Sequence, residues 1–160
     1  MPIGKASNPQ LQQAEQALVA KIPEQLREPF NRVIAAGLQI LYAPQLRDKL
    51  TQKLINGNPV KDAADGAVRL TAELFKQSKG TLPRPLVVPA VMVFAFEYLD
   101  VAEQAGVVKV DTKVIAETAR LASENVLRLA GLTDDKLRKV TRAAAGQKPG
   151  LVEGQMEGEA

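Results

Sequence analysis

The chain has 160 residues, of which 46% are hydrophobic and only 4% aromatic, so one domain with an aliphatic core is expected. Cysteine and histidine are both absent, which excludes disulfides, the commonest metal ligand and the usual activators of a nucleophile. The net charge of +3 combines 21 basic with 18 acidic residues, a mild balance that is not typical of a nucleic-acid-binding protein. Because histidine and cysteine are both lacking, we expect no enzyme, cofactor or metal.

Helix signals follow one another through the first part of the chain. Asn8 can cap a helix over 9–22, with a proline at its first position. Apolar residues at helical spacing predict a second helix over 29–41 and a third over 46–56. Gly57 would end the third helix in a left-handed conformation.

The second part of the chain repeats this pattern. Asn58 precedes a proline as Asn8 does, and an alanine-rich helix over 59–79 follows, closed by glycine. The segment 107–110 suits a brief extended stretch, after which Asp111 caps a helix that continues to a glycine at 131. The sequence therefore predicts an all-α bundle of about six to seven short helices punctuated by proline and glycine.

The segment 81–106 is the most distinctive part of the sequence. Its apolar run, 86–96, is short of the about 20 residues that a membrane-spanning helix needs, so a buried central helix is expected. Pro89 would mark the start of that helix or kink its first turn. Because apolar groups surround it, the helix is covered either by the rest of one chain or by an oligomer interface. In an oligomer, the predicted interface consists of Val91, Phe94, Phe96, Tyr98 and Leu99.

Two sets of carboxylates share helix faces at a spacing of three residues, one of them Asp62 with Asp65. The other set is Glu97, Asp100 and Glu103. A carboxylate-bridged metal site in a bundle normally includes histidine, which this chain lacks. We therefore interpret both sets as solvated acidic faces and assign no metal.

The C-terminal part combines a basic helix with a polar tail. Thr133 caps the last predicted helix, and the tail over 147–160 is glycine-rich and expected to be flexible. We therefore predict a helical domain over 1–146, best defined over 58–131. The basic side chains would complement the helix dipole or contact an acidic partner, with phosphate contact as the alternative; they are Lys136, Arg138, Lys139 and Arg142.

Three stretches together, 58–70, 78–90 and 99–106, resemble small helical virion proteins of tailed bacteriophages. The similarity spans residues 58–131 and includes the Gly-Thr-Leu-Pro turn at 80–83. The matched positions are prolines, glycines and apolar groups. The resemblance implies no catalytic residue.

What the resemblance implies is a structural role in the particle, as an internal or ejection protein or at the head–tail junction. The expected partners are further copies of the chain and other virion proteins. Nucleic acid through the basic helix is the alternative partner, and membrane contact is expected only of an oligomer. The start of the chain lacks the pattern of a signal peptide, so we expect synthesis in the host cytoplasm and incorporation into the virion.

Overall fold

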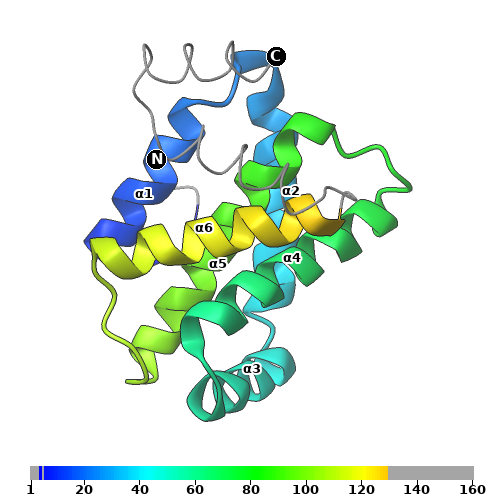
Figure 1. Cartoon of the computed structure of the whole chain (residues 1–160). Helices are drawn as coiled ribbons and strands as arrows, with labels where there is room; N and C mark the ends of the chain where they lie inside the picture. The colour runs from blue at the N-terminus through cyan, green and yellow to red at the C-terminus, as the bar shows by residue number, and fades with distance from the viewer. Residues whose placement is uncertain (1–3, 5, 130–160) are drawn as a thin grey trace.

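The computed structural model describes residue 4 and residues 6–129, and every regular element in that part of the chain is a helix (Figure 1). The all-α prediction is confirmed. The helix expected from Thr133 and the tail over 147–160 lie outside the described residues. The described elements, in chain order, are α1 (Pro9–Ala20), α2 (Glu24–Leu41), α3 (Pro44–Asn56), α4 (Pro59–Gln77), the 3-10 turn η1 (Arg84–Leu86), α5 (Val87–Gln104) and α6 (Thr112–Leu129).

Side chains cap three of the helices as the sequence predicts. Asn8 Oδ1 accepts hydrogen bonds from the first-turn amides of α1, and Asn58 Oδ1 accepts one from Lys61 N at 3.1 Å. Asp111 Oδ1 accepts one from Val114 N at 2.8 Å. Each cap satisfies an amide that has no partner within its own helix.

Two predicted helix ends differ from the structure. The second helix begins at Glu24, so Pro29 lies inside it; the one backbone hydrogen bond that this proline removes is offset because Phe30, on the same helix, is fully buried. Gly57 has φ −125° and ψ −155°, which is extended backbone and no left-handed end. Asn58, which follows, is extended as well, with φ −99° and ψ 107°, as expected of a residue that precedes a proline.

The loops around α5 also differ in part from expectation. The structure assigns no strand to 107–110, which simply connects α5 to α6. Pro89 lies in the first turn of α5, where its missing N–H removes no helical hydrogen bond. The predicted end of α4 near Gly80 is confirmed: the helix ends at Gln77, and Lys79 and Gly80 follow in the left-handed region with φ +56° and +78°.

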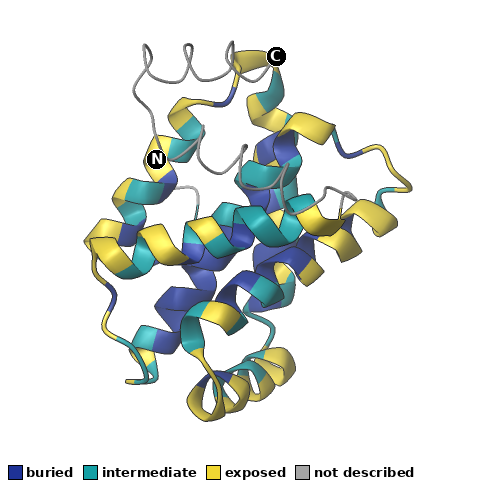
Figure 2. Cartoon of the chain, viewed as in Figure 1, coloured by how far each residue is buried: buried dark blue, intermediate teal, exposed yellow. Residues whose placement is uncertain are grey.

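The core is centred on α5, which contacts every other α-helix described. Figure 2 shows α5 as a largely buried helix behind α6, whereas α3 is mostly exposed. Two close approaches set the packing distance. Gly37 in α2 leaves room for the ring of Phe94, and Gly66 in α4 leaves room for the ring of Tyr98.

Candidate functional site

The first side of the candidate site is the polar face at the C-terminal end of α5. Glu97 and Asp100 are 0% and 1% exposed, so interpreting them as a solvated acidic face was wrong. Glu103, one turn further on, is half-buried. The carboxylates are buried because the chain's N-terminal segment covers them and supplies hydrogen-bond donors.

That N-terminal segment, 6–8, lies along α5, and its successive residues donate hydrogen bonds to successive carboxylates of the helix. Buried carboxylates need such donors because burial without a partner is costly. The contacts are Ala6 N to Glu97 Oε2 at 3.1 Å, Ser7 N and Oγ to Asp100 Oδ1 at 3.0 and 3.1 Å, and Asn8 Nδ2 to Glu103 Oε1 at 2.8 Å. The segment and α5 therefore form one hydrogen-bonded layer between residues far apart in sequence.

Glu15 of α1 is the second side of the site. It is 2% exposed, makes a side-chain hydrogen bond with Glu97, and its Oε2 has no hydrogen-bond partner among the described residues. Burial, with Glu97 as the second cause, raises the pKa of Glu15 to about 10. At neutral pH this carboxyl is therefore protonated, and the Glu15–Glu97 pair holds a proton.

Tyr42, at the end of α2, completes the site. Its hydroxyl donates to Glu97 Oε1 at 2.9 Å, and burial, followed by the nearby Glu97 charge, raises the pKa of Tyr42. Arg47 lies over the Tyr42 ring, with 5.3 Å from the guanidinium carbon to the ring centroid, and donates to Gln104 Oε1 at 2.8 Å. Because Glu15 is protonated, the Glu15–Glu97 pair carries less negative charge than two ionised carboxylates would.

The packing around the pair has little free space. The backbone of Gly4 lies so close to the Glu15 and Glu97 carboxylates that an added Cβ would collide with both. Among residue 4 and residues 6–129, no group of three or more acidic, histidine or cysteine side chains is arranged to hold a metal ion. The arrangement can bind and release a proton, and it ties α1 to α5.

The residues predicted as an interface lie in the core instead. Val91, Phe94, Phe96, Tyr98 and Leu99 are all buried within one chain. The sequence left open whether the rest of the chain or an oligomer interface covers this helix. In the structure, the rest of the same chain covers it. These side chains are therefore not exposed to a partner in this conformation.

The remaining acidic pair, Asp62 and Asp65, is only partly exposed. Asp65 accepts hydrogen bonds from Lys61 Nζ at 3.1 Å and from Asn125 Nδ2 at 2.7 Å, which joins α4 to α6. The predicted basic cluster of Lys136, Arg138, Lys139 and Arg142 lies outside the described residues.

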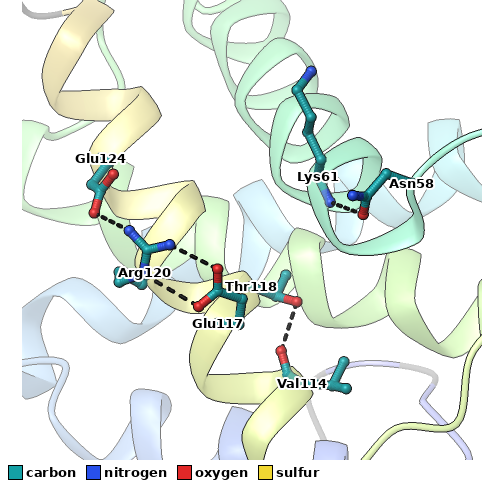
Figure 3. A network of polar contacts seen from close by, with 7 residues as sticks. All are labelled: Asn58, Lys61, Val114, Glu117, Thr118, Arg120 and Glu124. Atoms are coloured by element: carbon teal, nitrogen blue, oxygen red, sulfur yellow. Dashed lines mark hydrogen bonds and ion pairs between the residues drawn. The ribbon is translucent and has the colours of Figure 1, made fainter.

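The surface of α6 carries its own ion pairs. Figure 3 shows Arg120 between two carboxylates, with 2.7 Å to Glu117 Oε1 and 2.5 Å to Glu124 Oε2. Both pairs are within one helix and partly exposed, so they add little stability. Thr118, drawn in the same view, donates a hydrogen bond from its hydroxyl to the Val114 carbonyl oxygen at 2.8 Å. The charges of Arg120, Glu117 and Glu124 are therefore paired with one another on α6.

Two grooves open on the described surface. One, of about 440 Å³, lies between α2, the end of α4 and the turn that follows α4. The other, of about 340 Å³, lies between α3 and α4, where Leu46, Leu50 and Leu70 supply apolar lining. Its rim carries both signs of charge, from Lys49, Lys53, Asp62, Arg69 and Glu73.

One helix, Arg84–Gln104, is long and apolar enough by length and composition to cross a membrane. Of its most apolar window, 72% is buried inside the protein, as expected of the core helix of a bundle. No family model, no curated protein and no solved structure matches the chain.

Proposed function

We propose that the chain is a non-enzymatic structural component of a bacteriophage virion and that it assembles with further copies of itself. The resemblance of residues 58–131 to small virion proteins supports the first part. The observation that carries the second is the groove between α3 and α4, because α5 is already covered by its own chain.

The α3–α4 groove suits a contact between identical copies. Leu46 is 39% exposed at its edge, although it is a large apolar side chain. In a two-fold contact, the same surface of each copy forms the interface. A surface with both positive and negative side chains can therefore pair the positive groups of one copy with the negative groups of the other. Lys49 and Lys53 of α3 would then face Asp62 and Glu73 of the second copy.

Size measurement tests the assembly part of the proposal. We expect light scattering coupled to gel filtration to show an oligomer that dissociates when Leu46→Asp places a charge in the groove. Gln16→Asp, on the exposed side of α1, adds the same charge away from the groove and should leave the oligomer intact. A strictly monomeric protein at high concentration would contradict assembly through this groove.

Particle composition tests the virion part separately. We expect the protein in purified particles by mass spectrometry, and we expect particles made without its gene to lose infectivity or a second structural protein. Particles that lack the protein and keep full composition and infectivity would reject the virion role. That result would leave any self-association measured in solution unaffected.

A further inference from the structure

The Glu15–Glu97 pair connects an element at the edge of the bundle to the core helix. Glu15 belongs to α1, which contacts chiefly α5 and to a small extent α6, whereas Glu97 is fully buried in α5. The two carboxyl groups hydrogen-bond to each other. Two carboxylates that meet in a buried site cannot both stay ionised without strong repulsion. One proton therefore keeps them together.

We propose that this shared proton is a latch that holds α1 and the segment 6–8 against α5, and that loss of the proton releases α1 while α2–α6 stay folded. The inference does not depend on the proposed virion role. It rests on the hydrogen bond between the two carboxyls, on the burial of both, and on Glu15 Oε2, which has no hydrogen-bond partner among the described residues. That oxygen has nothing to stabilise a negative charge.

Among the described residues, the groups around Glu15 do not replace the proton. From α5, Glu97 and Asp100 both act on Glu15 as negative charges; from the end of α2, Tyr42 donates to Glu97. Arg47 of α3 lies over the Tyr42 ring and donates to Gln104 Oε1. On α6, the other helix that α1 contacts, Arg120 is engaged by the carboxylates on its own helix. No cation in the described contacts takes over the charge of Glu15.

Release is local because α1 is anchored differently from the rest of the bundle. One of its two buried side chains is the titratable Glu15, the other being Leu11, whereas α4, α5 and α6 pack against one another extensively. Elements with few buried contacts open before the whole protein unfolds. Once α1 leaves, the carboxylates on α5 and the apolar groups beneath Leu11 become accessible to a partner.

Linkage sets the size of the effect. The pKa of Glu15 is about 10 when α1 is docked, and its ordinary value is 4.5. Between these values the docked form binds a proton that the released form has lost. The ratio of released to docked α1 therefore rises up to about tenfold for each pH unit. Acid tightens the latch and alkali loosens it.

A spin-label distance measurement tests the latch directly. The chain has no cysteine, so nitroxides attach only at Gln16→Cys on α1 and Ala72→Cys on α4, both exposed positions. At about pH 5 we expect one narrow distance. Toward about pH 10 a longer, broader population should grow, while far-UV circular dichroism shows that most helix remains.

Neutral replacements of Glu15 provide the decisive comparison. Glu15→Gln keeps the shape of the side chain and cannot ionise, so α1 should stay docked over the whole range; Glu15→Leu serves the same purpose if the first variant does not fold. Glu24→Gln changes an exposed glutamate and should follow the parent protein. The proposal is overturned if α1 of the parent stays docked to about pH 10, or if the neutral variants release α1 with the same pH dependence.

Discussion

Adding one methyl group at Gly37 tests the close approach of α2 to α5. A Cβ at this position would collide with the ring of Phe94, which is fully buried and has no room to move. Overpacking of a well-packed core costs about 1–3 kcal/mol. Alanine gains about 1 kcal/mol over glycine inside a helix, so Gly37→Ala should destabilise the protein by about 0–2 kcal/mol net.

The double variant separates these two contributions. Phe94→Leu removes the outer ring atoms that the new methyl group meets, so in that background Gly37→Ala should cost nothing or stabilise by up to about 1 kcal/mol. Urea unfolding followed by circular dichroism of the helices measures all four proteins of the cycle. Equal effects of Gly37→Ala in both backgrounds would show that the ring does not set the distance between α2 and α5.

Three further predictions concern the polar contacts. Asn8→Ala and Asn58→Ala should each cost about 1 kcal/mol through loss of a cap, and Asn8→Ala should cost more because its amide also binds a carboxylate of α5; thermal unfolding ranks them. Tyr42→Phe removes the hydroxyl that donates to Glu97 Oε1, while Ala6 N still donates to Oε2, so we expect about 1–3 kcal/mol lower stability by urea unfolding, and no loss would count against this contact. The pKa of Glu15 is raised on folding, so its stabilisation is complete below its ordinary pKa and is lost as pH rises toward about 10; the unfolding free energy should fall by at most about 1.4 kcal/mol per pH unit, a slope that Glu15→Gln should abolish.

Local sequence signals were enough to predict most of the fold. Asn8 and Asn58 each precede a proline, and both cap helices because capping depends on residues within one turn. The apolar run of 86–96 correctly indicated a core helix, since a helix that is apolar all round has to be buried. The start of α2 was misplaced because Pro29 suits a first turn, whereas the tertiary contacts of the helix tolerate it inside.

Local sequence signals could not predict the candidate site, because the residues that contact one another in it are far apart in sequence. Glu97 and Asp100 show helical spacing and carry charge, which is typical of an exposed face. Their donors, at Ala6 and Ser7, are mostly backbone amides and leave no mark in the sequence. One signal was present: Glu97 comes directly after an apolar run on a helix with apolar groups all round, so its carboxylate is buried with its neighbours.

The two ends of α5 are held in different ways, and this difference explains why α1 can be separable. Around Phe94 and Val91 the helix packs through apolar groups alone, and these contacts do not respond to pH. From Glu97 onward, one face of the helix accepts hydrogen bonds from the segment 6–8 and contacts the protonated Glu15, while Tyr98 and Leu99 still pack in the apolar core. Changing the charge of this polar face therefore weakens α1 and leaves the apolar packing of α4 and α6 intact. The proton on Glu15 accordingly controls one layer of the fold, and the apolar contacts hold the rest.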